Sequence, residues 1–168
     1  MAKQVEPFRY VDPMTRRIIE AWIGREPKHQ LPWAPLAKPL EECTVAIVSS
    51  AGLAMADDEP FDQAREREEP WWGDPSYRRI PATATEDDLR CYHLHINPTH
   101  VMSDLDCALP MRRLRELADE GVISAVADEH YTMMGYILRP AELLAKTVPA
   151  LIERLRAAAV DAVALVPI

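Results

Sequence analysis

The sequence predicts an α/β protein with three layers, in which a mainly parallel β-sheet carries helices on both faces, like half of a Rossmann-like or flavodoxin-like fold. Two apolar segments, 43–49 and 161–167, are short and contain β-branched residues, which is typical of buried strands. Two longer segments, 110–120 and 140–158, carry apolar residues at helical spacing. Because strand-like and helix-like segments alternate along the chain, we expect a parallel sheet.

The 168 residues suit a single domain, and the formal net charge is −8. An acidic chain lacks the basic face that attracts nucleic acids or anionic membranes, so neither is an expected partner. No apolar run approaches the roughly 20 residues that cross a bilayer, and the first residues lack the pattern of a signal peptide. Because the three cysteines include no C-x-x-C pair, we expect a reduced, cytoplasmic protein.

Residues 1 to about 40 are expected to form a proline-rich N-terminal arm of this domain. Asp12 or Thr15 is a candidate N-cap for a helix that ends near Gly24. The segment 26–40 that follows contains four prolines, which favour a loop over a helix or a strand.

A second irregular segment, about 54–85, is highly charged and is expected to be a long loop. Loops of this length are uncommon in compact domains unless they have a function or are disordered. The adjacent Trp71 and Trp72 argue against disorder, because disordered segments contain few aromatic residues. We therefore expect an ordered loop that covers either a site or an apolar surface.

The remaining segments continue the alternation of strands and helices. Residues 89–96 are expected to form the second strand, and 122–126 a third. Pro110 is expected to open a helix that Gly121 ends. The longer helix at 140–158 then leads into the last strand.

The densest group of chemically able side chains lies at 89–114, where a strand passes into a helix. His93 and His95 are two residues apart in the expected strand, so their side chains point to the same face. The loop that follows adds a histidine, two carboxylates and a thiol, namely His100, Asp104, Asp106 and Cys107. Because α/β proteins keep their sites beyond the carboxyl ends of strands, we expect a site here.

Two interpretations of the histidines follow from residue type alone. His93, His95 and His100 suit the ligands of a divalent metal such as zinc or iron. Alternatively, His93 and His95 form a hydrogen-bonded pair at the end of a strand, because histidine is also a frequent structural residue.

The acids and the thiol of this segment also have two interpretations. Asp104 is a candidate catalytic residue and Asp106 a candidate substrate-binding residue, or both are turn and capping residues before the helix. Cys107 is a candidate catalytic nucleophile. Since a neighbouring carboxylate would raise the pKa of the thiol, the alternative is a buried, inert cysteine.

Two further segments are candidates for the same pocket. Tyr77 and Arg78 are candidate substrate-binding residues, with the guanidinium on a substrate carboxylate, or they belong to an exposed turn. His130 is a candidate acid or base and Tyr131 a candidate substrate contact, or both lie in a connection between a strand and a helix.

Several motifs follow one another in a fixed order: CTVAIVSSAG, GDPSYRRIP, H-x-H with D-L-D-C, LPMRRLRELADEGVIS, HYTMMGYI and VDAVALVP. From about residue 43 to 167, this order resembles the family of glycine/sarcosine/betaine reductase component B and D-proline reductase selenoprotein subunits. The resemblance implies reductive chemistry on a small carboxylate- or amine-bearing molecule. It also implies that His93 and His95 bind the substrate or donate a proton, with Asp104 and His130 around the pocket.

The sequence departs from the family after the last strand. In the family this strand is followed by a cysteine or selenocysteine, near a second cysteine, and then by a further α/β half, neither of which follows Pro167 here. Three explanations stay open: a partner chain supplies that half, reductase chemistry has been lost, or translation stopped at a selenocysteine codon. A last strand without a following helix leaves apolar surface uncovered, so we expect a homo- or hetero-oligomer.

Three functions are therefore carried forward. The chain is a reductase-related enzyme or subunit whose thiol or selenol comes from a partner chain or from Cys107. Alternatively, it is a metal-dependent enzyme that uses the His93 and His95 cluster. The third hypothesis is a non-catalytic subunit that completes the active site of a partner.

Overall fold

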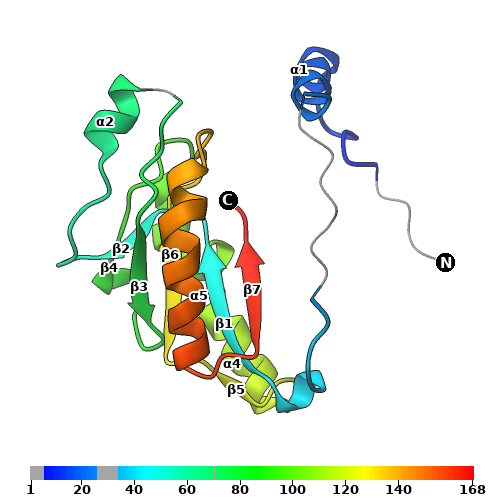
Figure 1. Cartoon of the computed structure of the whole chain (residues 1–168), viewed down its shortest axis with the longest axis vertical. Coiled ribbons are helices and arrows are strands. Elements are labelled where there is room, and N and C mark those ends of the chain that lie inside the picture. Colours follow the sequence, from blue (N-terminus) through cyan, green and yellow to red (C-terminus); the bar gives the residue numbers. More distant parts are fainter. Residues whose placement is uncertain (1–5, 26–33, 70) are drawn as a thin grey trace. The chain divides into compact units, whose positions relative to one another are not determined.

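The structure of the chain is a computed structural model, which describes residues 6–25, 34–69 and 71–168. The chain divides into two compact units, residues 1–35 and 36–168 (Figure 1). The second unit contains the β-sheet and all the candidate site residues. Within the described parts of the chain, no helix is long and apolar enough to cross a membrane.

The first unit contains helix α1 (Pro13–Ile23). Asp12 caps this helix, because its carboxylate accepts hydrogen bonds from the main-chain N–H groups of Met14 and Thr15, both at 3.0 Å. The helix predicted there is confirmed, with Asp12 rather than Thr15 as its N-cap. The proline-rich segment predicted to follow lies outside the described residues from residue 26 to residue 33.

The sheet of the second unit is built around β1 (Thr44–Ser49), and most of its pairs are parallel. β5 (Ala125–Val126) pairs with the start of β1 and β6 (Glu129–Met133) with its end, while β7 (Ala162–Val166) runs alongside nearly its whole length. β3 (Tyr77–Pro81) is antiparallel to β6. The predicted α/β class with a mainly parallel sheet is confirmed, and β3 makes the sheet mixed.

Helices lie on both faces of this sheet (Figure 1). In the view of Figure 1, α5 (Val148–Ala157) crosses in front of β6 and β1, and α4 (Met111–Asp119) lies behind them. Side chains alternate between faces along a strand, so Ile47 of β1 packs with the cluster that includes α4, and Val48 packs with α5. Burial of each such side chain contributes roughly 1.5–3 kcal/mol. The finer likeness to a Rossmann-like or flavodoxin-like half stays a prediction.

A separate antiparallel pair of strands leads to the histidines. β2 (Leu53–Met55) pairs with β4 (Leu89–Cys91), and the strand predicted to continue to residue 96 therefore ends five residues early. The N–H of Tyr92 still donates to the carbonyl of Gly52 (2.8 Å), in register with this pair. The ladder stops there because the N–H of Gly52 donates to Met133 and the carbonyl of Tyr92 accepts from Gln63, so the return bond is not made. His93 and His95 consequently lie beyond the strand, and His95 is in the turn that follows.

The segment predicted as a long loop, 54–85, contains regular structure. It includes helix α2 (Gln63–Glu68), capped by Asp62, and strand β3. β6 also replaces the predicted connection around His130. β3 and β6 form strands because they pair with each other, and β6 also pairs with β1. Local composition does not show which segments will meet in this way.

Short helices complete the connections. They are η1 (Leu40–Glu42), η2 (Glu86–Asp88), α3 (Pro98–Ser103), η3 (Leu105–Cys107) and the π-helical segment η4 (Leu143–Thr147) that precedes α5. The predicted helix at 110–120 is confirmed as α4, and the predicted last strand is confirmed as β7.

Candidate functional site

The carboxyl ends of three parallel strands meet close to His93. The N–H of Ser50, one residue past β1, donates to the carbonyl of Val166 in β7 at 3.1 Å, and its hydroxyl accepts from the N–H of Ile168 at 2.8 Å. The N–H of Gly52 donates to the carbonyl of Met133, the last residue of β6, at 2.8 Å. These bonds draw the turns after β1, β6 and β7 together at one edge of the sheet.

Two glycines let His93 approach this edge closely. Gly52 has a φ of +60°, and a Cβ atom placed on it would lie 3.1 Å from the main-chain nitrogen of His93. A Cβ on Gly135, two residues past β6, would lie 2.4 Å from Nε2 of His93 and 3.1 Å from the carbonyl oxygen of Ile168. The imidazole of His93 therefore occupies space that a side chain at position 135 would fill.

His93 is held as a neutral, oriented ring. Its side chain is buried, and its Nδ1 accepts a hydrogen bond from the N–H of His95 at 3.1 Å. Burial first, and then the neighbouring His95, lower the pKa of His93, so the ring is uncharged near pH 7. A neutral imidazole that accepts at Nδ1 carries its proton on Nε2. That Nε2 has no hydrogen-bond partner among the described residues.

A cavity of about 260 Å³, which we call the histidine cavity, lies beside His95. Five residues line it: Glu66, Arg67, Leu94, His95 and Tyr136. The ring of His95 lies 4.4 Å from that of Tyr136 and 5.9 Å from that of His93, between ring centres. Tyr136 has a φ of 58°, which is uncommon for a residue with a large side chain. The cavity thus combines residues from α2 and from the segments after β4 and β6.

Glu66 is the most unusual side chain of the histidine cavity. It is buried, and neither carboxylate oxygen has a hydrogen-bond partner among the described residues. Burial, and then the negative charge of Asp74, raise the pKa of Glu66, while Arg67 opposes the shift. α2 is held over the histidine segment because Nε2 of Gln63 donates to the carbonyl of Tyr92 at 2.5 Å.

Glu66 and Tyr136 are functional candidates that sequence reasoning missed. Glu66 lies in the charged stretch AREREE, where it resembles its solvated neighbours. Tyr136 lies in the HYTMMGYI motif, but its positive φ has no signature in the residue type. For Glu66, the sequence signal was the expectation of an ordered loop over a site. For Tyr136, it was the prediction that the segment from His130 to Tyr136 returns to the same pocket.

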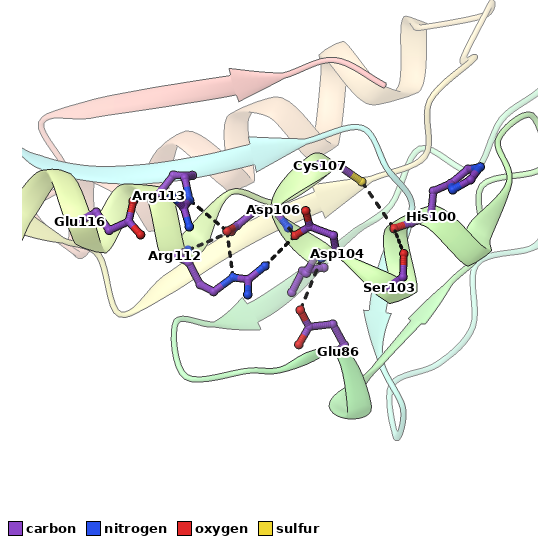
Figure 2. A network of polar contacts seen from close by, with 10 residues as sticks. Glu86, His100, Ser103, Asp104, Asp106, Cys107, Arg112, Arg113 and Glu116 are labelled. Atoms are coloured by element: carbon purple, nitrogen blue, oxygen red, sulfur yellow. Dashed lines mark hydrogen bonds and ion pairs between the residues drawn. The ribbon is translucent and has the colours of Figure 1, made fainter.

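Asp104 and Asp106 lie in a different group, the acid–arginine network, which also includes Arg112 and Arg113 (Figure 2). Asp104 pairs with Arg112 at 2.6 Å, and Asp106 pairs with Arg112 at 2.9 Å and with Arg113 at 3.4 Å. Asp106 also accepts from the N–H of Arg112 at 3.0 Å, in the first turn of α4. These contacts match the capping interpretation of both acids.

His100 and Cys107 lie next to this network (Figure 2). The thiol of Cys107 is 3.9 Å from the carbonyl oxygen of His100, and the residue is exposed. Neither residue lines the histidine cavity, and neither do Asp104 or Asp106. The structure therefore brings His93 and His95 together and places the other four candidates of this segment elsewhere.

His130 is fully buried within the sheet. Its Nδ1 accepts a hydrogen bond from the N–H of Ile47 at 3.2 Å, at the point where β5 gives way to β6. Burial, and then the positive charge of Arg115, lower the pKa of His130 to about 4. The ring thus accepts from the N–H of Ile47, which lies between the residues of β1 that pair with β5 and those that pair with β6. His130 does not line the histidine cavity.

The predicted substrate-binding residues of β3 and β6 lie around another part of the sheet. Tyr77 and Arg78 line an open hollow of about 370 Å³ with Arg79 and Glu129. Arg78 is held there by the carbonyl of Glu59 at 2.8 Å. Tyr131 is buried, and its ring lies 5.9 Å from that of Tyr77, between ring centres. The roles predicted for these residues stay predictions.

The described residues form no cluster of side chains that could bind a metal ion. In the described part of the chain, no three histidine, cysteine, aspartate or glutamate side chains are grouped so that they could hold a metal ion. Nδ1 of His93 is engaged by the main chain, and His100 belongs to α3. A zinc or iron site at His93, His95 and His100 therefore stays a prediction that this geometry does not fit.

The fold and this edge of the sheet define an α/β protein whose candidate site lies beyond the carboxyl ends of parallel strands, where such proteins keep their sites. Residues 25–167 match the model of the family described as glycine/sarcosine/betaine reductase selenoprotein B. The chain therefore belongs to this family, and the resemblance inferred from its motifs is confirmed.

Two curated relatives support the assignment. D-proline reductase subunit gamma of Acetoanaerobium sticklandii is 34% identical over 133 residues, which are 79% of this chain and 52% of the relative. Glycine reductase complex component B subunit gamma of Carboxydothermus hydrogenoformans is 29% identical over 136 residues, which are 81% of this chain and 30% of the relative. This chain thus spans about half of one relative and less than a third of the other. No solved structure matches it.

Proposed function

We propose that the chain is a subunit of a reductase that acts on a small carboxylate- or amine-bearing molecule, and that the histidine cavity receives this molecule. The family supports a reductase-related role, since both relatives are named as subunits of amino-acid reductases. The observation that carries the proposal is the position of the cavity. It is lined by His95, whose main chain is held by His93, and His93 packs against the joined carboxyl ends of β1, β6 and β7.

His95 is the residue that we assign to the substrate. It lines the cavity, and its main-chain N–H is fixed by Nδ1 of His93. An imidazole there can bind a substrate carboxylate or deliver a proton to a leaving nitrogen, and such proton transfer typically accelerates a reaction 10²–10⁴-fold. His93 is a positioning residue in this scheme, because it is buried and acts through the main chain of His95.

The attacking thiol or selenol is assigned to a partner chain. Reductive cleavage of the family type needs a reactive thiol or selenol and a second group that resolves the adduct. Burial raises the pKa of Cys91, which disfavours its reactive thiolate, and Cys43 is fully buried. Cys107 is exposed but lies beside the acid–arginine network. We therefore expect the chain to act in a hetero-oligomer.

Reconstitution tests the proposal. The chain is co-expressed with the proteins encoded by neighbouring reading frames and purified by an affinity tag. The complex is then assayed for consumption of glycine, sarcosine, betaine and D-proline, with dithiothreitol as the electron donor. We expect one of these substrates to be consumed, and His95→Ala to lower turnover about 100-fold because it removes the acid or the binding group.

His100→Ala is the matched control, since it removes a second exposed imidazole that does not line the cavity. Circular dichroism melting of each variant shows whether it folds. A His95→Ala complex with wild-type turnover would contradict the site assignment. A complex that turns over only through residues of the partner would instead support the non-catalytic subunit.

A further inference from the structure

Glu66 has a chemical state that the proposed reaction does not yet explain. Only 5% of the residue is exposed, and neither carboxylate oxygen has a hydrogen-bond partner among the described residues. A buried carboxylate without a partner is costly, so native proteins pair such groups or neutralise them. Here the side chain lines a cavity of about 260 Å³ that has room for a partner from outside the chain.

The charged neighbours of Glu66 are engaged elsewhere. Arg67, the other charged residue of the cavity wall, directs its guanidinium to the carbonyl and the side-chain oxygen of Gln63, at 3.5 and 3.4 Å. Asp74 accepts from the N–H of Asp62 at 2.9 Å and from Ser76. Among the described residues, no cationic group therefore pairs with Glu66.

Two of the residues that line the cavity are aromatic. Tyr136 and His95 pack together with their ring centres 4.4 Å apart. Tyr136 adopts a backbone conformation with a φ of 58°, and residues held in such sparsely populated regions cluster at ligand sites. The face of a tyrosine ring attracts a cation, and Tyr136 is exposed enough (41%) for a ligand to reach it. A cavity that combines a buried carboxylate with aromatic residues is thus suited to an organic cation.

We propose that Glu66 is a specificity-determining residue that binds the ammonium group of a small amine, with the ring of Tyr136 as the second contact. This inference rests on the proposed function, in which the same cavity receives the substrate. Of the two groups that the proposed function allows, a carboxylate or an amine, this inference names the amine as the group that Glu66 binds. Arg67, an exposed residue of the cavity wall, would have to exchange its long contacts with Gln63 to meet a carboxylate of the same molecule.

The titration of Glu66 makes the proposal measurable. Burial and the charge of Asp74 raise the pKa of Glu66, and a bound ammonium favours the ionised form. Binding therefore releases a proton near that pKa, and affinity falls as pH falls and the free carboxyl becomes protonated. Four titratable or charged groups surround the site: Arg67, Asp74, His95 and Tyr136.

Titration of the full chain with three probes tests the proposal by nuclear magnetic resonance. Pyrrolidine carries only an ammonium group, propionate carries only a carboxylate, and proline carries both. We expect pyrrolidine to shift the signals of Tyr136 and His95. We expect Glu66→Gln to weaken its binding at least tenfold at pH 8. At lower pH, where the free carboxyl of Glu66 is protonated, the variant should lose the proton release that calorimetry detects for the wild-type chain. Glu68→Gln, an exposed neighbour on α2, is the matched control and keeps wild-type affinity.

Three results of these titrations would overturn the proposal. Pyrrolidine that fails to bind the wild-type chain, or binds Glu66→Gln equally well, shows that Glu66 is not an ammonium site. Equal weakening of propionate and pyrrolidine shows that the substitution damages the cavity as a whole. Failure of the proposed function looks different, because amines then bind at Glu66 while the reconstituted complex consumes no substrate. Conversely, if turnover of the reconstituted complex is lost in His95→Ala but not in Glu66→Gln, the role of Glu66 is wrong and the proposed function stands.

Discussion

The acid–arginine network and the histidine cavity differ in how their polar groups are satisfied. In the network, Asp104 and Asp106 are matched by Arg112 and Arg113, and most of these side chains are exposed. In the cavity, Glu66 is buried and unpaired among the described residues. Exposed ion pairs of the first kind contribute roughly 0–1 kcal/mol each. An unpaired buried charge is instead a cost that a ligand can offset.

This difference changes which part of the 89–114 segment is functional. The sequence places histidines, acids and a thiol in one short stretch, and all are chemically able. In the structure, the acids stabilise the start of α4, while the histidines meet residues from α2 and from the turn after β6. Density of reactive residue types is therefore a weaker guide to a site than an unsatisfied polar group in a cavity.

The largest change in the free energy of unfolding is expected from the titration of His130. Like His93, His130 is buried and has a ring nitrogen without a hydrogen-bond partner among the described residues. Its pKa is lowered from 6.5 to about 4 in the folded chain. The unfolded chain binds the proton first as pH falls, so stability is lost between pH 6.5 and 4, by about 3 kcal/mol. Urea unfolding at pH 7 and at pH 4 measures this loss. In His130→Asn, which keeps an acceptor for Ile47, the loss becomes smaller by that amount.

The residual pH dependence of the His130→Asn variant has a second source. The pKa of His93 is also lowered, so its contribution has the same sign and stays in the variant. His100→Asn serves as the control, because it replaces an exposed imidazole. Parallel stability curves for wild type and His130→Asn would show that His130 does not carry the effect.

A smaller loss of stability is expected from substitution of Gly135, which lies against the ring of His93. Gly135→Ala places a methyl group 2.4 Å from Nε2 of His93, so the ring must move. Overpacking of this kind costs about 1–3 kcal/mol. Because His93 orients His95, turnover of the reconstituted complex should fall as well. Urea unfolding and the substrate assay measure the two consequences.

Removal of the clashing ring checks the cause of the Gly135→Ala effect. In a double variant with His93→Ala, the alanine at position 135 should cost less than it does beside the imidazole. If the cost of the Gly135 substitution is the same in both backgrounds, the close contact seen here is not its origin.

The smallest effect is expected in the acid–arginine network. Asp106→Ala removes the acceptor of the Arg112 N–H and two ion pairs, and the loss of such a cap costs about 1 kcal/mol. Arg113→Ala removes two ion pairs of an exposed guanidinium and no main-chain bond, and it should cost about 0.5 kcal/mol or less. Urea unfolding measures both. A cost of Asp106→Ala no larger than that of Arg113→Ala would count against the capping role.

The sequence by itself determined the class of the protein. Runs such as CTVAIVS are apolar over their whole length, because a central parallel strand is covered on both faces. The alternation with amphipathic helices indicated the mainly parallel sheet, and the order of motifs indicated the family. These features are local or collinear, so they can be read without knowing which segments touch.

The tertiary structure alone decided the site. His93 and His95 were identifiable from their residue type, but they lie beyond the strand because Gly52 bonds to Met133 and Tyr92 accepts from Gln63, both distant in sequence. Glu66 differs from its charged neighbours only because α2 folds over the histidine segment and buries it. Burial and the loss of hydrogen-bond partners arise from long-range packing, and no pattern within a short stretch of sequence encodes them.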